Sequence, residues 1–373
     1  MKPLIRADLD TIPTYAAGRT VAGSLKLASN EISLPPPPSV LAAISEAAAT
    51  GNRYPDPAAT RLTARLAQRH EVSPDRIAVG CGSVLLCGQL VQSVCGAPTD
   101  EVIIAWRSFE AYPIVAQVGN ARVVKVPLDA EHRHDLKAMA AAITPNTRLI
   151  FLCSPNNPTG TAIRYDELQT FLGKVPPNVL VVLDEAYREF VTDPDVPDGL
   201  TLLPRWPNLV ALRTFSKAYR LAGFRVGYAI GSSNVINALR KVHPAFSVST
   251  VAQAAAVAAL ECLPELLSTC TEITRERTRV REVLLQFGYS VTPSQTNFLW
   301  LPLGERATEF AAHCTQEKVI VRPFAGDGVR VTVAGEDEND TFLTAAKTFT
   351  LTSCRSPLGV AGVSAPASGG RRA

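Results

Sequence analysis

The sequence predicts an α/β fold in which a mostly parallel sheet is covered by helices on both faces, followed by a smaller α+β domain. From Ile77 onward, short apolar segments that suit strands are separated by segments with helical periodicity. These strand candidates are apolar along their whole length, which is typical of strands that are buried on both faces. After residue 250 this regular alternation gives way to long helical stretches.

The N-terminal arm, residues 1–50, is expected to join the smaller domain, and residues 51–250 to form the large domain. Helices are predicted at about 39–49 and 60–69, before the alternation starts. Within the alternation, the expected strands are 77–79, 102–105, 122–126, 149–153, 179–183, 209–213 and 226–230. The expected helices are 83–95, 109–118, 135–142, 165–174 and 232–242.

The smaller domain is predicted to span residues 251–352. It should begin with an alanine-rich helix at 251–262 and a charged helix around 274–284. The segments that follow suggest a strand at 298–303, a helix at 306–318 and strands at 319–324 and 329–333. The tail, 353–373, is rich in Gly, Ser, Pro and Ala and is predicted to be disordered.

Composition excludes several classes of protein. The chain has 373 residues, 46% hydrophobic and 19% charged, with a formal charge of +3, so no basic bias indicates nucleic-acid binding. Its eight cysteines lack CxxC spacing and lie mostly in apolar runs, which favours buried reduced thiols over a zinc site or disulfides. No signal peptide or membrane-spanning run is recognisable, so we expect a soluble cytoplasmic protein.

The segment around Lys217, residues 212–228, is the centre of the predicted site. It reads LRTFSKAYRLAGFRVGY and follows an apolar strand candidate. Ligands of open α/β sheets bind at such strand ends. Two hydroxyls, Thr214 and Ser216, and the guanidinium of Arg225 suit a phosphate, while the lysine amine suits condensation with a carbonyl. The alternative is a surface lysine in a polar loop.

Four further segments that follow strands carry candidate residues. Gly82 and Ser83 start a helix, where free backbone N–H groups can bind a phosphate. Asn157 could donate to a cofactor oxygen, and Phe109 could stack on a planar ring. Asp184 ends an apolar strand and needs a cationic partner, with Tyr187 three residues on. Each has an ordinary alternative: a glycine turn, an Asn-capped turn, a core aromatic or a helix-capping Asp.

Taken together, these residues describe a pocket for pyridoxal phosphate. The lysine would form an imine with the cofactor, and the aspartate would keep the pyridine nitrogen protonated. The asparagine and tyrosine would flank the phenolic oxygen, and the glycine turn, hydroxyls and arginine would hold the phosphate. Lysine displaced by the substrate would then carry protons.

The motifs SPNNPTG (154–160), DEAY (184–187), TFSKAYRLAGFRVGY (214–228) and VRVTV (329–333) resemble those of the fold-type-I pyridoxal phosphate aminotransferases. Their order and spacing are similar to the histidinol-phosphate aminotransferase branch. The resemblance runs from KLASNE (26–31) to residues 338–340. Finer features, such as NRYPD, WRSFEAYP and QTNFLWLPLG, look most like the aromatic amino acid aminotransferases of that branch.

For the cofactor, the resemblance implies a covalent bond to Lys217, pairing of Asp184 with the ring nitrogen, and contacts of Asn157 and Tyr187 with the ring hydroxyl. It places the phosphate against Gly82, Ser83, Thr214, Ser216 and Arg225. It also implies that Tyr54 reaches the phosphate of the neighbouring subunit's cofactor, and hence a homodimer.

For the substrate, the resemblance implies that Arg330 clamps the α-carboxylate through its bidentate fork. Asn30 and Arg322 are the other expected substrate-binding residues. Arg322 resembles an arginine that helps to bind the substrate phosphate in histidinol-phosphate enzymes, but the same VRP sequence occurs in aromatic ones. Apolar walls are expected from Ile32, Leu34, Phe109 and Phe324.

Two positions depart from the family pattern. Arg220 stands where the family usually has glycine, and could narrow the entrance or point to solvent. NEIS (30–33) replaces the NENP of histidinol-phosphate enzymes, and its lack of polar donors favours an aromatic substrate. Outside the motifs, His132 and His134 are expected in a solvated loop rather than a metal site, and the charged run 274–282 on the outer face of a helix.

The predicted function is therefore transamination between an aromatic amino acid and a 2-oxoacid. A histidinol-phosphate aminotransferase is the main alternative, since it shares the cofactor pocket and differs in having to bind a phosphate dianion. A non-catalytic pyridoxal phosphate-binding protein, or a lyase or decarboxylase of the same fold, remains open from the sequence.

Overall fold

The central element of the structure, a computed structural model that describes residues 6–12 and 21–353, is a seven-stranded sheet in the order β2-β8-β7-β6-β5-β3-β4. Only β8 runs antiparallel to its neighbours within this sheet. The strands are β2 (Ile77–Gly80), β3 (Glu101–Trp106), β4 (Arg122–Pro127), β5 (Thr147–Cys153), β6 (Leu180–Asp184), β7 (Leu209–Thr214) and β8 (Gly227–Ile230). The predicted fold class, a mostly parallel sheet between helices, is confirmed.

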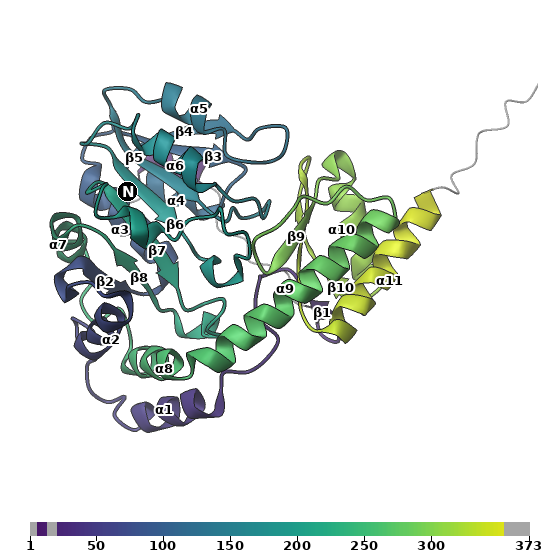
Figure 1. Cartoon of the computed structure of the whole chain (residues 1–373), viewed down its shortest axis with the longest axis horizontal. Coiled ribbons are helices and arrows are strands. Elements are labelled where there is room, and N and C mark those ends of the chain that lie inside the picture. The colour runs from purple at the N-terminus through teal and green to yellow at the C-terminus, as the bar shows by residue number, and fades with distance from the viewer. Residues whose placement is uncertain (1–5, 13–20, 354–373) are drawn as a thin grey trace, which may run out of the picture.

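Helices cover both faces of this sheet because its buried strands present apolar side chains to each face in alternation. Val102 and Ile104 of β3 pack with one helical layer, and Ile103 between them packs with the other. The first layer consists of α3 (Gly82–Val94), α4 (Ala111–Val118) and α7 (Ser233–Lys241). The second contains α1 (Pro38–Ala48), α2 (Thr60–His70), α5 (Leu136–Ala141), α6 (Tyr165–Leu172) and α8 (Thr250–Glu261), as Figure 1 shows.

The direction of the strands decides where polar residues can gather. The parallel strands β3, β5, β6 and β7 end at one edge of the sheet, and β2 ends there too, because it pairs with the antiparallel β8. The reversed strand β8 instead begins at this edge. The segments after five strands and the segment before a sixth therefore converge on one place, as expected for a ligand site in an open α/β sheet.

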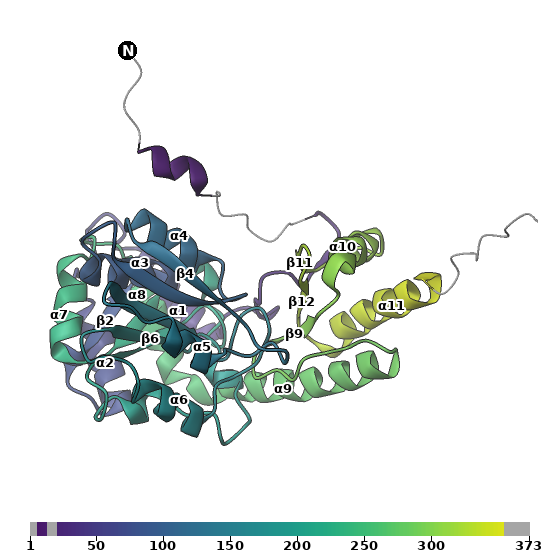
Figure 2. The same ribbon diagram turned by 90° about the horizontal axis from the view of Figure 1, so that it is seen from above.

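A smaller antiparallel sheet and three helices form the other lobe in Figures 1 and 2. This sheet contains β9 (Phe298–Leu301), β12 (Gly328–Thr332) and β11 (Arg322–Phe324). Its helices are α9 (Leu263–Gln286), α10 (Ala307–Gln316) and α11 (Glu336–Ser353). The arm strand β1 (Leu25–Lys26) pairs in parallel with β10 (Val319–Ile320), which ties the N-terminal arm to this lobe. The division into domains stays a prediction.

Several elements differ from the sequence-based expectation. The charged helix is the second half of the 24-residue α9, and α11 was not predicted. The charged run does not lie wholly on an outer face, since Glu276 and Arg277 are buried. Arg277 donates to the carbonyls of Phe190 and Thr296, so this guanidinium links α9 to two loops. The tail after residue 353 lies outside the described residues.

Seven cysteines within the described residues are free thiols, and five of these are buried. Over residues 6–12 and 21–353 no single helix has the length and apolar character needed to cross a membrane. The bent pair α8 and α9, whose axes differ by 78°, meets that criterion only when taken together, by length and composition alone.

Candidate active site

A cavity of about 510 Å³ lies at the edge of the large sheet where the strand ends converge. Twelve of the predicted site residues line it: Asn30, Ser83, Phe109, Asn157, Asp184, Tyr187, Thr214, Ser216, Lys217, Arg225, Arg322 and Arg330. Gly82 lies against Arg225, one of these lining residues. A Cβ atom added at Gly82 would come within 2.4 Å of Arg225 Nη2. The structure therefore brings most of the residues selected from the sequence together around one cavity, and their individual roles stay predictions.

Asp184 is a buried carboxylate at the last position of β6 and is 2% exposed. Tyr112 donates to its Oδ2 at 2.7 Å, and the backbone N–H of Ala186 donates to Oδ1 at 3.1 Å. Burial raises the pKa of Asp184 to about 6, although the two hydrogen bonds and Lys217 oppose that rise. A cation placed in the cavity would stabilise this carboxylate.

Tyr112 is a site residue that sequence reasoning missed. Its ring stacks on Phe151 at 4.4 Å between centroids and meets the edge of Phe109 at 5.5 Å. The available signal was the segment AWRSFEAY, where the helix predicted over 109–118 would put residues 109 and 112 one turn apart, although α4 begins only at Ala111.

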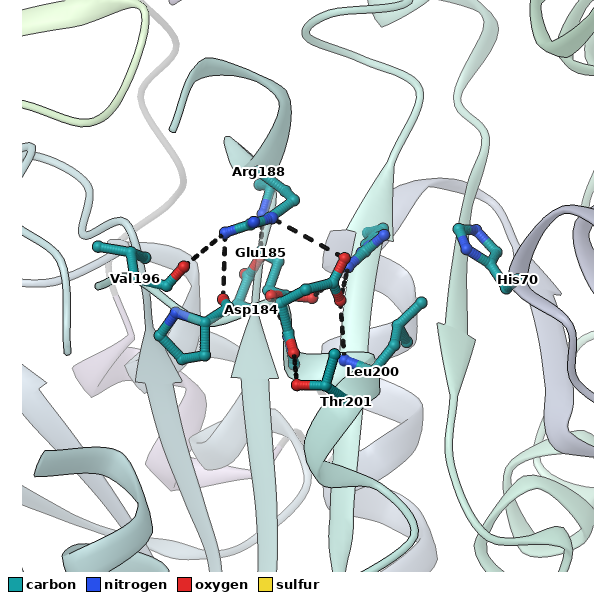
Figure 3. A network of polar contacts seen from close by, with 12 residues as sticks. His70, Asp184, Glu185, Arg188, Val196, Leu200 and Thr201 are labelled. Atoms are coloured by element: carbon teal, nitrogen blue, oxygen red, sulfur yellow. Dashed lines mark hydrogen bonds and ion pairs between the residues drawn. The ribbon is translucent and has the colours of Figure 1, made fainter. Parts of the chain in front are cut away.

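A second polar cluster lies directly behind Asp184 (Figure 3). Arg213 Nε and Nη2 donate to Glu185 Oε2 at 3.1 and 2.9 Å, and Nη2 also donates to Asp198 at 2.6 Å. Glu185 accepts from the N–H of Gly199, so the loop after β6 is attached to the same cluster. This ion pair joins the ends of β6 and β7, the strands that carry Asp184 and Thr214.

The outer members of this cluster complete its hydrogen bonding. Arg188 donates to the carbonyls of Val196 and Pro197, each at 3.1 Å. His70 lies on the other side, with Nε2 3.0 Å from Tyr228 Oη. Burial, reinforced by Arg213, lowers the pKa of His70 to about 4, so this imidazole is neutral at pH 7.

Lys217 extends its amine into the cavity, where Nζ donates to the carbonyl of Ser29 at 3.1 Å. The side chain also passes the ring of Tyr187, with Nζ 5.9 Å from the ring centroid. Burial and the nearby charges of Arg330 and Arg225 lower the pKa of Lys217 to about 7, against the opposing effect of Glu31. A large fraction of this amine is therefore neutral and nucleophilic near pH 7.

Donors that suit a phosphate surround the start of α3. Thr214 Oγ1 donates to Ser216 Oγ at 3.0 Å, and Arg225 Nη1 donates to the same hydroxyl at 3.2 Å. Gly82 has φ +76° and leaves room for the guanidinium of Arg225. A hydroxyl pair, a guanidinium and a helix N-terminus thus converge on one part of the cavity, the combination that binds phosphate groups.

A second set of cavity residues joins the arm, the large sheet and the small sheet. Asn30 Nδ2 donates to Tyr187 Oη at 2.9 Å, and its own N–H donates to Thr332 at 2.9 Å. Arg330 Nη1 donates to Asn157 Oδ1 at 2.6 Å, while Nη2 donates to the carbonyl of Ala28 at 2.6 Å. The predicted substrate side therefore consists of residues that are far apart in sequence.

The apolar walls differ in part from the expectation. Phe109 and Phe324 line the cavity as predicted, but Ile32 and Leu34 are not among its lining residues. Leu34 is 49% exposed, and Ile32 packs on the large core. The start of α4 supplies further walls through Ala111, Ile114 and Val115. The arm lines the cavity only through residues 28–31, so its next residues turn away.

Tyr54 lies outside the cavity of its own chain. Its side chain is 82% exposed and stacks on Phe246, with 4.7 Å between ring centroids. Its predicted role at a neighbouring subunit stays a prediction.

Arg220 neither narrows the cavity nor points freely into solvent. It donates to the carbonyl of Pro35 at 3.0 Å and to Thr269 Oγ1, so it bridges the arm and α9. Its backbone has φ +58°, a left-handed conformation that favours glycine. This conformation explains why glycine suits the position, and the two contacts explain what arginine adds.

His132 and His134 were both predicted to lie in a solvated loop, and for His134 this prediction is wrong. His134 is buried, and its Nε2 accepts from the N–H of Cys153 at 3.4 Å, because the segment folds back on β5. Burial lowers the pKa of His134 to about 4. Among residues 6–12 and 21–353, no group of three or more His, Cys, Asp or Glu side chains is placed to hold a metal ion.

Residues 22–345 match the family model described as aminotransferase class I and II. The chain belongs to this family. An aromatic amino acid aminotransferase of Nocardia farcinica is 55% identical over 92% of this chain and 96% of its own length. Another of Rhodococcus jostii is 54% identical over 97% and 99%. A crystal structure of histidinol-phosphate aminotransferase from Sinorhizobium meliloti with pyridoxal-5'-phosphate has a TM-score of 0.85 at 29% identity, covering 94% and 98%.

The site of this aminotransferase fits pyridoxal phosphate on its own geometry. The buried carboxylate of Asp184 faces the cavity and would be stabilised by a protonated ring nitrogen. The residues around the start of α3, namely Gly82, Ser83, Thr214, Ser216 and Arg225, form a phosphate cup that would bind the phosphate. The neutral amine of Lys217 would bond to the carbonyl carbon. These three functions are the ones that the cofactor's ring, phosphate and aldehyde require.

We predict that the amine of Lys217 in the cofactor-free aminotransferase titrates near pH 7. Competitive labelling with acetic anhydride from about pH 5 to about pH 11.5, read by peptide mass spectrometry, should give reactivity that rises through about pH 7 and then levels off. Because the folded-state pKa is lowered, the neutral form should dominate above that pH. The exposed Lys241 serves as an internal comparison, and a midpoint for Lys217 near an ordinary lysine value of about 10.4 would contradict the prediction.

A second prediction concerns Arg220 in this aminotransferase. Arg220→Ala should lower the free energy of unfolding more than Arg220→Gly, because both lose the contacts with Pro35 and Thr269 but only glycine accepts φ +58° without strain. The difference between the two variants should be about 1–2 kcal/mol in urea unfolding. Equal stability of the two variants would mean that the backbone is not strained there.

Proposed function

We propose that this aminotransferase transfers the amino group of an aromatic amino acid, phenylalanine, tyrosine or tryptophan, to a 2-oxoacid such as 2-oxoglutarate, with pyridoxal 5′-phosphate as cofactor. The observation that carries the proposal is that one cavity unites the low-pKa amine of Lys217, the buried carboxylate of Asp184 and the phosphate cup at Arg225. The names of the relatives at 52–55% identity support the substrate class.

In this proposal, each group of residues holds one part of the cofactor. Lys217 binds it covalently and Asp184 pairs with its ring nitrogen, while Phe109 covers a face of the ring. Asn157 and Tyr187 contact the ring hydroxyl. The phosphate is bound by Gly82, Ser83, Thr214, Ser216 and Arg225. When bound, the cofactor supplies a protonated ring that withdraws electrons from the substrate's Cα.

The chain's own residues then position the substrate and move the proton. Arg330 lines the same cavity and can bind a carboxylate through its planar fork. The amine of Lys217, with a pKa of about 7, can both accept and return the Cα proton near neutral pH. Tyr187, Asn30 and Thr332 form a hydrogen-bonded chain that orients this side of the cavity.

The substrate's side chain is expected against the apolar walls. Phe109, Phe324 and Ile114 suit an aromatic ring, which can stack or meet them edge-on. Histidinol phosphate is the second candidate, because Arg322 lines the same cavity and could bind a phosphate. Family membership favours transamination over the lyase, decarboxylase and non-catalytic alternatives.

We also propose a cytoplasmic homodimer with shared active sites. The exposed aromatic pair Tyr54 and Phe246 supports this proposal, because exposed aromatic side chains are enriched where proteins associate. Tyr54 of one subunit would reach the phosphate bound by the other.

Asp184→Asn should leave a folded aminotransferase with little activity. The amide can still accept from Tyr112, but it carries no charge to keep a ring nitrogen protonated. We expect kcat/KM to fall by about 2.7–4 kcal/mol of transition-state stabilisation or more, the range for an essential electrostatic group. Circular dichroism checks folding, and Asp195→Ala, an exposed acid in a nearby loop, is the control. Near-normal turnover would assign the ring nitrogen to another partner.

A half-reaction screen tests the proposed substrate class. The yellow holoenzyme is mixed separately with phenylalanine, tyrosine, histidinol phosphate and glutamate, and the change of cofactor absorbance is followed. We expect kcat/KM for phenylalanine or tyrosine to exceed that for histidinol phosphate by roughly tenfold or more, or about 1.4 kcal/mol. A preference for histidinol phosphate would establish the second candidate instead.

A further inference from the structure

Two arginines face each other on the small sheet beside the cavity. Arg322 of β11 and Arg330 of β12 are direct cross-strand partners, and both line the cavity. Their guanidinium carbons lie 5.7 and 5.8 Å from the centroid of the Phe324 ring. One wall of the substrate site thus carries two permanent positive charges around an aromatic ring.

Glu110, from the large sheet's side of the cavity, forms an ion pair with one of these arginines. Its Oε2 accepts from Arg322 Nη2 at 2.8 Å, across 212 positions of sequence. The two side chains are 33% and 17% exposed, and both line the cavity. Glu110 directly precedes α4, the helix that also contributes Ala111 and Ile114 to the apolar wall. The ion pair therefore lies where the substrate's anionic group and its side chain would meet.

The carboxylate of Glu110 changes the net charge of the wall formed by Arg322 and Arg330, and so the anions that this wall can bind. Arg322, Arg330 and Glu110 together carry a single net positive charge, which suits a carboxylate with one negative charge. A phosphate dianion would need both guanidiniums and would lie close to the carboxylate of Glu110. Discrimination of this kind, by a like charge placed against the wrong ligand, is a common way to obtain specificity.

We propose that Glu110 is a specificity-determining residue, which pairs with Arg322 and thereby adapts the anion-binding wall to amino acid carboxylates and against phosphate monoesters. The proposal rests on the aminotransferase function proposed above and refines its substrate class. Glu110 acts through Arg322 and needs no contact with the substrate's reacting atoms.

A purely structural role for Glu110 gives a different expectation. Two arginines directly opposite each other on antiparallel strands repel, and a carboxylate paired with one of them relieves that repulsion. If this were its whole role, removal of the charge would lower thermal stability and leave substrate preference unchanged. The two roles are therefore separable by experiment.

The chain offers a matched control close by. Arg107 also lies 5.7 Å from the Phe324 ring centroid, and it pairs with Asp327. Neither Arg107 nor Asp327 is among the residues that line the cavity. Asp327→Asn therefore makes the same change of charge near the same ring, without releasing an arginine that lines the cavity.

The experiment compares holoenzymes of the wild type, Glu110→Gln, Asp327→Asn, Arg322→Gln and the double variant Glu110→Gln/Arg322→Gln. For each, kcat and KM are measured with phenylalanine and with histidinol phosphate. We expect Glu110→Gln to raise the ratio of kcat/KM for histidinol phosphate over phenylalanine by roughly tenfold. The effect of Glu110→Gln should lie mainly in KM. In Asp327→Asn the ratio should stay within about twofold of the wild type. In the Arg322→Gln background, Glu110→Gln should no longer change the ratio.

Two further measurements keep the outcomes distinct. Glu110→Ser removes the charge but keeps a residue that suits the position before a helix, and it replaces Glu110→Gln should that variant fold poorly. Calorimetric titration of each holoenzyme with inorganic phosphate should show tighter binding on loss of Glu110 but not of Asp327. A wild type that does not turn over phenylalanine would contradict the proposed function but not the role of Glu110. The phosphate titration tests that role independently of turnover. An unchanged ratio and unchanged phosphate affinity, or equal effects of Asp327→Asn, would overturn the proposal.

Discussion

The ion pair between Arg213 and Glu185 is the interaction on which the geometry of the site depends. It joins the ends of β6 and β7 beneath the cavity, with Arg213 6% exposed and Glu185 2% exposed. Glu185 directly follows Asp184, and Arg213 directly precedes Thr214, and both Asp184 and Thr214 line the cavity. The pair therefore fixes the spacing of two groups that would contact different parts of a ligand. Breaking a buried pair by removing one partner typically costs 3–5 kcal/mol, so this spacing is strongly held.

The antiparallel strand β8 has a similar consequence on the neighbouring side. Because it begins where β7 ends, the chain turns from Lys217 to Arg225 within a few residues and returns along the same edge. A Cβ atom at Gly227 would come within 2.9 Å of both the Arg213 carbonyl and the Ser83 N–H. Close approach of these three backbones places the start of α3, the hydroxyls and Arg225 around one point, which no single strand end could do.

The sequence was sufficient for groups that lie within a local motif and insufficient for contacts between distant segments. The position of Lys217, Asp184 and Gly82 at one edge of the sheet could be predicted, because each ends or follows an apolar strand and these strands end at one edge. Tyr112 and the Arg213–Glu185 pair could not, although an arginine within the apolar run before Thr214 indicated a buried partner. The contacts of Arg220 and the burial of His134 depend on how far the arm and a loop fold back, which local pattern does not encode.

Burial is the largest cause of the shifted pKa values of both Asp184 and Lys217, and both shifts favour a bound ligand. The pKa of Asp184 is raised to about 6, so above that pH the carboxylate carries a charge that burial opposes. The pKa of Lys217 is lowered to about 7, so below that pH the amine carries a charge that burial opposes. At any pH near neutrality the cavity lining therefore contains at least one charge that burial opposes. A ligand that offers Asp184 a cationic partner and takes the neutral amine of Lys217 removes both costs at once. Since such a ligand binds the folded state and not the unfolded chain, it must also stabilise the fold. The burial that lowers the pKa of Lys217 is therefore also a reason why cofactor binding should raise the free energy of unfolding.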